Sequence, residues 1–441
     1  MKGFKSVLII LFVSLQAISG FLTAGETYTP IDTANFQMRK KLANDYQKNQ
    51  KKFIRGLSAV YSGNELSFAR KRLSDSGKEL YEEIVRGDYL FHDSLNHLLN
   101  QSYQLLRKNN QSVPETPDFF VSRDITLNAF SMSDQTYLVN IGTFYFLENE
   151  HQLTALLAHE LAHKMLNHQS ESLKSMYKSF AEDAKESLSE IRRSKYGRGT
   201  KALEKYRSML YAQGKLDRKQ EFEADSLGYL LYKNAGLNPS DYLYSFRMMF
   251  KYDSVPLPDI GTDIYRKLFN LPNQPFNESW LKTEDFSGYD YSRFREKFDR
   301  DSLSSHPEME ERIARLEQLY PELKEIRKPE KPGSLFANIQ EMVRLERFYC
   351  LEYQENYGDG IFISIYYLTN ADETEKGYFE YWLGKYFNKI LEARKSYTLN
   401  RYLERVNPRN QPPAYQQFLN FMWNLKVQEI ENIARHYSKT I

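Results

Sequence analysis

The sequence predicts a mainly α protein, in which an α+β core with a small sheet is followed by a helical carboxy-terminal region. Apolar residues recur at helical spacing over most of the chain. Three short segments between residues 119 and 141 instead have the aromatic and β-branched composition of strands. A linker rich in Pro and Lys at residues 327–333 then separates two helix-rich regions. With 441 residues, of which 41% are hydrophobic, the chain can form more than one packed region.

The predicted elements follow in a simple order. Helices are expected over residues 36–108, from Asn149 onward, over 170–207, over 217–234 and after Pro307 through Leu319, and strands over 119–121, 125–130 and 136–141. A polar turn at 132–135 joins the last two strands. Asn149 is expected to cap its helix together with Gln152. Residues 253–300 are mixed in composition, and we assign no element there.

The chain starts with a signal-peptide pattern over residues 1–24. Lys2 and Lys5 precede a mostly apolar run from Val7 to Ile18, and small residues follow. We expect the segment to be cleaved and the protein to be exported to the periplasm or cell envelope. An uncleaved anchor is the alternative, because the apolar stretch can be extended through Leu22 to a marginal spanning length.

Composition excludes several classes of protein. Lys and Arg total 60 and Asp and Glu total 58, so the net charge of +2 creates no field that favours nucleic acid. The mean hydropathy is −0.65 and no long apolar run follows the first two dozen residues, which excludes a polytopic membrane protein. Cys350 is the single cysteine, so any metal must be held by His and carboxylate side chains.

The segment His159-Glu160-Leu161-Ala162-His163 is an H-E-x-x-H motif. On a helix, His159 and His163 project from one face and can bind one zinc ion. Glu160 lies beside that face, where it can take a proton from the attacking water. With eight His in the chain, a chance occurrence is the alternative interpretation, but the motif lies in a strongly helical segment, as its mechanism requires.

Zinc needs a third protein ligand, and Glu221 is the best candidate. It shares one helix face with residues at i+3, i+4 and i+7, which are Ala224, Asp225 and Gly228. The small residues on this face and on the His helix would let the two backbones approach closely. Asp225 would then accept a hydrogen bond from a ligand imidazole. A solvated helix face is the alternative for both acids.

Four separated blocks of the chain resemble the gluzincin peptidase family of the CAAX prenyl proteases and the HtpX heat-shock proteases, and most closely its soluble, exported bacterial branch. In chain order they are Asn128-Ala129-Phe130 with Ile141-Gly142, His159 to His168, Glu221 to Gly228, and Ser305-His306-Pro307 with Arg312 to Leu316. The resemblance covers about residues 60–320. It implies a gluzincin-type zinc metalloprotease domain, to which we assign residues 25–326.

The resemblance also implies roles for individual residues. The ligands of one zinc ion per chain would be His159, His163 and Glu221, and the base would be Glu160. His306 and Arg312 would line the cleft, where such donors can stabilise an oxyanion. A helix-capping residue before Pro307 is the alternative for His306. The strand segment Asn128-Ala129-Phe130 would bind a peptide substrate by main-chain hydrogen bonds.

The other histidines are not predicted to have a role at the site. His151 and His168 lie eight and five residues from the nearer ligand, at spacings that place neither on the metal. His92, His97 and His436 are isolated in the sequence.

Residues 335–441 form the predicted helical carboxy-terminal region. A helical hairpin is expected around the turn at 370–374, and a final helix is expected after Pro412. The pattern resembles tetratricopeptide-like hairpins, although it has no clean 34-residue period. Two alternatives remain: a helical cap on the core, or a module that binds a protein partner through outward-facing aromatic residues such as Trp382 and Tyr386.

The sequence as a whole predicts an exported zinc metalloendopeptidase that acts on protein or peptide substrates in quality control or processing in the cell envelope. Water would attack the peptide bond directly, without an acyl-enzyme. The alternative is a chaperone or assembly factor for envelope proteins that uses the same cleft with little proteolysis. The intact Glu160 favours the enzyme. No nucleic acid partner is expected, and membrane contact is expected at most through an uncleaved amino-terminal segment.

Overall fold

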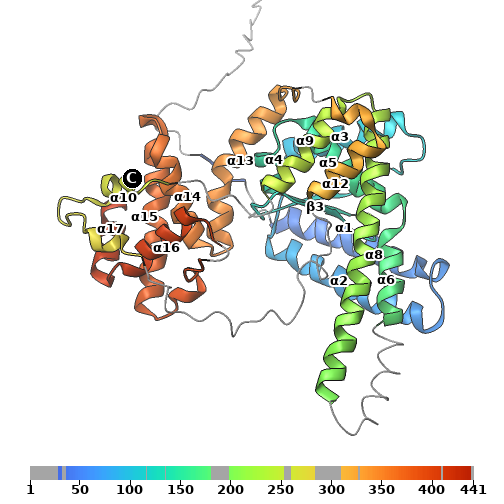
Figure 1. The fold of residues 1–441 in the computed structure, drawn as a ribbon, viewed down its shortest axis with the longest axis horizontal. Coiled ribbons are helices and arrows are strands. Elements are labelled where there is room, and N and C mark those ends of the chain that lie inside the picture. Colours follow the sequence, from blue (N-terminus) through green and yellow to red (C-terminus); the bar gives the residue numbers. More distant parts are fainter. Residues whose placement is uncertain are drawn as a thin grey trace, which may run out of the picture.

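The computed structural model describes residues 28–31, 36–115, 117–134, 136–179, 198–252, 260–283, 309–325, 328–408 and 411–438. The predicted signal peptide at 1–24 and His306 lie outside these ranges. The observed elements confirm the predicted fold class, mainly α with one small sheet and a helical carboxy-terminal region (Figure 1). Among the described helices, none combines the length and the apolar character that a membrane crossing requires.

The elements have the following bounds. The α-helices are α1 (Phe36–Gly56), α2 (Gly63–Arg86), α3 (Asp93–Asn109), α4 (Ile141–Phe146), α5 (Glu150–Met165), α6 (His168–Met176), α8 (Arg198–Asn234), α9 (Pro239–Lys251), α10 (Thr262–Phe269), α12 (Met309–Leu319), α13 (Ser334–Tyr353), α14 (Tyr357–Asn370), α15 (Glu373–Lys395), α16 (Pro413–Asn424) and α17 (Val427–Tyr437). The strands are β1 (Tyr89–Leu90), β2 (Phe119–Ser122), β3 (Ala129–Ser131) and β4 (Tyr137–Asn140). Short 3₁₀ turns include η3 (Glu278–Leu281) and η5 (Pro321–Lys324).

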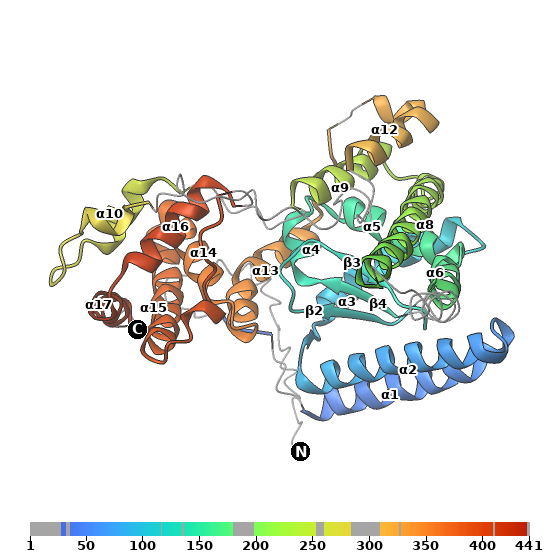
Figure 2. The ribbon, with the colours of Figure 1, turned by 60° about the horizontal axis from the view of Figure 1, so that its bottom comes forward.

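The four strands form one mixed sheet in the order β1-β2-β4-β3. β2 and β4 run parallel, whereas β3 runs antiparallel to β4. β3 is therefore an edge strand within the described part of the chain. One face of the sheet belongs to the main hydrophobic core with α3 and α5, and the other packs Phe120 and Leu138 against the α1–α2 hairpin (Figure 2). This places β3 beside the helix that carries the H-E-x-x-H motif.

The strand predicted over 125–130 is shorter in the structure, where only Ala129–Ser131 pair with β4. The reason is a local turn. Asp124 Oδ1 accepts hydrogen bonds from both the backbone N–H and the hydroxyl of Thr126, at 2.8 Å each. Such Asx turns compete with the ladder for the backbone.

Helix α8 is longer than the predicted helix over 217–234, because it begins at Arg198 and continues for 37 residues. No proline interrupts this stretch, and its charged residues are good helix formers. α8 packs along α5, and the two helices together form the centre of the amino-terminal half (Figure 2).

The carboxy-terminal helices α14–α17 form a second group, and the unassigned segment 260–283 packs on them (Figure 1). The ring of Phe269 on α10 lies 4.8 Å from that of Phe421 on α16. Tyr437 donates a hydrogen bond to the carbonyl of Leu268 at 2.6 Å. A segment from within the predicted protease region is thus part of the carboxy-terminal helical group.

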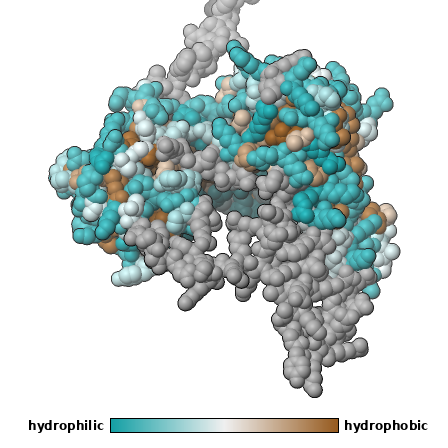
Figure 3. All heavy atoms as spheres, viewed as in Figure 1, coloured by the Kyte–Doolittle hydropathy of each residue, from teal (hydrophilic) through white to brown (hydrophobic). Residues whose placement is uncertain are grey.

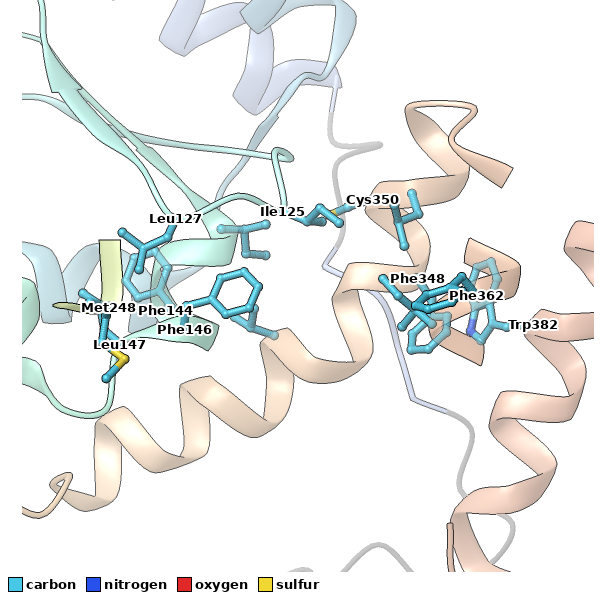
Figure 4. Close-up of a cluster of buried hydrophobic side chains, with 14 of the residues drawn as sticks. Ile125, Leu127, Phe144, Phe146, Leu147, Met248, Phe348, Cys350, Phe362 and Trp382 are labelled. Carbon is cyan, nitrogen blue, oxygen red and sulfur yellow. The ribbon is translucent and has the colours of Figure 1, made fainter. Parts of the chain in front are cut away.

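Helix α13 joins the two helical groups. Phe348 on α13 and buried side chains on both sides of this helix, including Phe144 and Trp382, belong to one continuous hydrophobic core (Figure 4). Trp382 and Tyr386 are fully buried in this core, so neither faces outward.

The linker before α13 and the amino-terminal segment are both fixed by hydrogen bonds. The Glu330 N–H donates to Asp241 at 3.2 Å, and the Gly333 N–H donates to Glu150 at 3.0 Å. The buried carboxylate of Glu346 on α13 accepts hydrogen bonds from the Tyr28 hydroxyl at 2.8 Å and from the Ile31 N–H at 3.0 Å. Both segments therefore belong to the folded body.

The surface drawn in Figure 3 is mainly hydrophilic, with apolar residues in small groups. The most exposed large apolar side chains among the described residues are those of Tyr397, Phe36 and Leu319, which lie far apart in the sequence: in the turn after α15, at the start of α1 and at the end of α12. Apolar residues scattered singly are normal for a protein surface.

Candidate metal centre

Two helices bring the three predicted metal ligands together. His159 and His163 lie on α5, which begins at the Asn149 cap, where Asn149 Oδ1 accepts the Gln152 N–H at 2.9 Å. Glu221 lies on α8. The two imidazole Nε2 atoms are 3.1 Å apart, and the Glu221 carboxylate lies 3.5 Å from His159 Nε2 and 3.3 Å from His163 Nε2.

These side chains fit a single metal ion. Their ligand atoms all lie within 4.8 Å of one another. Among the described residues, no other group of three or more His, Cys, Asp or Glu side chains is arranged in this way. A tetrahedral ion at about 2.1 Å from its ligands would separate them by about 3.4 Å, close to the distances observed. Burial alone would lower the pKa of His159, but Asp225 and Glu221 outweigh burial and raise this pKa to about 10. The site therefore favours a positive charge between these groups.

Small residues let α8 approach α5 as the sequence predicts. Ala224 and Ala155 are fully buried. A Cβ built on Gly228 would lie 3.0 Å from His159 Cα and 2.7 Å from the Tyr242 hydroxyl, so nothing larger than glycine fits there without movement. This contact sets how far the Glu221 carboxylate reaches toward the two imidazoles.

Asp225 and Arg312 lie behind the ligands. Asp225 Oδ1 lies 3.0 Å from His159 Nδ1. Arg312 donates two hydrogen bonds to Asp225, at 2.9 and 2.6 Å, and its Nη1 lies 3.0 Å from Glu221 Oε2. Burial alone would raise the pKa of Asp225, but Arg312 and His159 outweigh it and hold this pKa below its usual value.

The position of Arg312 differs from the predicted one. We expected its guanidinium to line the cleft as an oxyanion donor. Arg312 is instead only 2% exposed, and its guanidinium nitrogens face the carboxylates of Glu221 and Asp225. The physical reason is charge compensation, because two buried carboxylates need a cation beside them. His306, the other predicted oxyanion donor, lies outside the described residues.

The Glu160 carboxylate is held by the edge strand. The Ser131 N–H on β3 donates to Glu160 Oε2 at 2.9 Å, and the Ser131 hydroxyl lies 3.3 Å from the same oxygen. The carbonyl of Ser131 accepts a hydrogen bond from the side-chain amide of Gln169, which lies on α6. Ser131 thereby connects the predicted base to both β3 and α6.

The predicted substrate-binding segment Asn128-Ala129-Phe130 lies at this edge. Side chains alternate along a strand, so Ala129 is buried and Phe130 is 44% exposed. Asn128 and Phe130 line a cavity of about 520 Å³ between the sheet and α2. The structure thus places the segment where an added peptide strand could pair with it.

Sequence reasoning missed His168. This residue is buried, and its Nδ1 lies 3.0 Å from Nδ1 of the ligand His163. The left-handed backbone at Asn167, with φ of 57°, turns the chain between α5 and α6 and brings His168 back to the site. A spacing of five residues on one straight helix would not place it there. The only signal in the sequence was the inclusion of His168 in the family block.

A helix that carries H-E-x-x-H, joined by a Glu from a second helix and flanked by an edge strand, defines a metallopeptidase centre. The sequence profile of peptidase family M48 matches residues 96–320, which is more than half of the chain. The chain therefore belongs to peptidase family M48 and to its class of metallopeptidases, which confirms the predicted gluzincin family. Comparison with curated proteins gave no match. The soluble, exported branch of the family remains a prediction.

Proposed function

We propose that the chain is a zinc-dependent endopeptidase. The observation that carries this proposal is the spacing of 3.1–3.5 Å among the ligand atoms of His159, His163 and Glu221. Two imidazoles and one carboxylate are a common protein ligand set for catalytic zinc, which keeps its fourth position open. A bound zinc ion would supply a Lewis acid that polarises the scissile carbonyl and lowers the pKa of water.

Glu160 moves the proton in this proposal. Its carboxylate takes a proton from the attacking water and delivers it to the leaving amine, so no acyl-enzyme forms. The Ser131 N–H at 2.9 Å fixes one oxygen, Oε2, and leaves the other to accept the proton. The carboxylate is thus oriented before substrate arrives, which is how enzymes reduce the cost of reorganisation.

The proposed substrate is an extended segment of a protein or peptide, which adds to β3 as a further strand. The pairing of Phe130 with Leu138 on β4 leaves the backbone groups of Ala129 and Ser131 on the outer side of β3. Because Glu160 and Gln169 already bind Ser131, the substrate would pair through Ala129. His306 remains the proposed oxyanion donor.

Action in the periplasm or cell envelope, in protein quality control or processing, is proposed from the signal-peptide pattern alone. A single, fully buried Cys350 suits an oxidising compartment, because the fold does not depend on a disulfide. A protein partner bound through the carboxy-terminal helices has less support, since Trp382 and Tyr386 are buried. No observation on the described residues favours a chaperone over an enzyme.

The test compares Glu160→Gln with wild type on casein. We expect both proteins to hold one zinc per chain and to unfold alike, whereas only wild type cleaves casein, because an amide cannot accept the proton. Glu148→Gln, at an exposed glutamate near the same helix, is the matched control and should cleave normally. Undiminished zinc-dependent cleavage by Glu160→Gln would contradict the role of Glu160, and full zinc content in Glu221→Ala would contradict the ligand set.

A further inference from the structure

The imidazole of His163 has a second partner besides the metal site. Its Nδ1 lies 3.0 Å from Nδ1 of His168. His168 Nε2 in turn lies 3.3 Å from Glu223 Oε2 on α8. The three side chains form a line that starts at a predicted metal ligand and ends at a carboxylate that is 42% exposed.

We propose that His168 and Glu223 are positioning residues that hold the His163 imidazole in the tautomer and orientation required to bind the metal. The inference rests on the proposed metal site. Neither residue is itself a metal ligand.

The proton positions along this line follow from the metal site. His163 offers Nε2 to the metal, so its proton is on Nδ1 and is donated to His168. His168 accepts with Nδ1, so its own proton is on Nε2, which faces Glu223 Oε2. In these tautomers His163 donates to His168, and the His168 N–H lies in charge contact with Glu223 rather than in an aligned hydrogen bond. Outer hydrogen bonds of this type fix the tautomer and ring orientation of a ligand histidine.

The surrounding structure holds His168 in place. Its side chain is 3% exposed, and its carbonyl accepts a hydrogen bond from the Gln220 amide at 3.1 Å. Gln220 is itself held by the Ser172 hydroxyl at 2.9 Å. Together with the turn at Asn167, these contacts leave the imidazole little freedom to rotate away from His163.

Helix α8 supplies the outer partners of both histidine ligands. Asp225 lies directly against His159 at 3.0 Å, whereas Glu223 reaches His163 through His168. The same helix also carries the ligand Glu221. One helix therefore orients all three metal-binding side chains, and a shift of α8 would disturb all of them at once.

The test is a double-mutant cycle on zinc affinity, measured by competition with a chelator at fixed pH on the full chain. We expect Glu223→Ala and His168→Leu each to weaken zinc binding by about 10–100-fold. The double variant should bind no more weakly than His168→Leu, because the effect of Glu223 passes through His168. Glu223→Gln should restore affinity to near wild type, since its amide oxygen still accepts the His168 N–H.

Glu223 keeps the inference testable if His168→Leu fails to fold, because a carboxylate that is 42% exposed can be replaced without loss of the core. Zinc affinity in Glu223→Ala equal to that of wild type would overturn the inference. Additive losses in the double variant would do the same, as they would show that the two residues act separately. A wild-type chain that binds no zinc would contradict the proposed metal site itself, and would thereby be distinguished from a failure of this inference.

Discussion

Gly228 on α8 faces the backbone of His159 on α5 so closely that a Cβ at Gly228 would lie 3.0 Å from His159 Cα. The added Cβ would be attached directly to the backbone of α8, and the Cα belongs to the backbone of α5, so relief requires one helix to move. The distance between α5 and α8 is thus set beside a metal ligand, about one helical turn after Asp225, the outer partner of that ligand.

The first prediction concerns this contact. Gly228→Ala should destabilise the chain by about 1–3 kcal/mol through overpacking and should weaken zinc binding, because Glu221 moves away with α8. Urea unfolding in chelator and a zinc titration measure the two effects. Gly377→Ala on α15, where a Cβ meets nothing within 4 Å, is the control and should be neutral or stabilising. Equal behaviour of the two variants would mean that the helices adjust without cost.

The second prediction concerns Arg312. Arg312→Met leaves the buried carboxylates of Glu221 and Asp225 without their cation, so we expect a loss of about 3–5 kcal/mol in unfolding free energy when no metal is bound. Arg312→Lys should recover only part of this loss, because an ammonium group cannot reproduce the two-pronged contact. Arg266→Met, which removes a solvent-exposed ion pair with Glu278, is the control and should leave stability close to that of wild type. A neutral Arg312→Met would show that the carboxylates are compensated in another way.

The third prediction concerns pH and Asp241. Burial alone would raise the pKa of Asp241, but the His151 imidazole 3.8 Å away and hydrogen bonds from Asn149 and the Glu330 N–H outweigh it and lower this pKa. Because the pKa of Asp241 is lower in the folded chain than its ordinary value of 3.8, the ionised carboxylate stabilises the fold fully above pH 3.8. This stabilisation is lost as the pH falls below that value. Asp241 also raises the pKa of its charge partner His151, so the contribution of the His151 charge is complete below pH 6.5 and declines above it.

Asp241→Asn should therefore cost about 1–3 kcal/mol near pH 5.5, and the difference from wild type should shrink toward pH 3 and, to a smaller extent, toward pH 8. Unfolding midpoints across this range in chelator provide the measurement. Asp263→Asn, at a side chain that is 98% exposed, is the control. A difference that stays constant with pH would show that the charge of Asp241 does not matter.

The fourth prediction concerns the carboxy-terminal region. A chain that stops at Pro332 should be insoluble or unfolded, because Tyr265, Phe269 and Trp280 would lose the helices that cover them. Loss of α13 would also expose the core on the side of Phe144. Solubility, circular dichroism and zinc content test this, with a chain that ends at Ser438 as the control. Cleavage of a short peptide by the shortened chain would instead show that the region is a separate module.

The parts of the fold that depend on local sequence could be predicted. The cap at Asn149 and the spacing of His159 and His163 are set within one helix, and the small face at Gly228 can be read from a single helical turn. These features need only the helical period and the chemistry of each side chain. The family resemblance could also be predicted, because its separated blocks are local in sequence, and the family profile over residues 96–320 confirms it.

The rest depends on long-range contacts. His168 reaches the site through a left-handed turn at Asn167 that no periodicity reveals. Arg312 was predicted to line the cleft because a cation near a catalytic site can stabilise an oxyanion. Its observed position beside the carboxylates of Glu221 and Asp225 depends on how α12 packs against α8, which local sequence does not reveal. Within the segment 260–283, Ile264, Leu268 and Phe269 have helical spacing, but this pattern spans only eight residues, and the place of the segment depends on the carboxy-terminal helices against which it packs.

The hydrogen bond from the Ile31 N–H to Glu346 spans 315 positions in the sequence. Closing so long a loop costs chain entropy before the contact can repay it, so such contacts form late in folding. The segment at 28–31 can reach its final place only once α13 (Ser334–Tyr353) has been made. The amino-terminal half therefore cannot complete its packing from its own residues, because the start of the folded body depends on a helix from the later part of the chain.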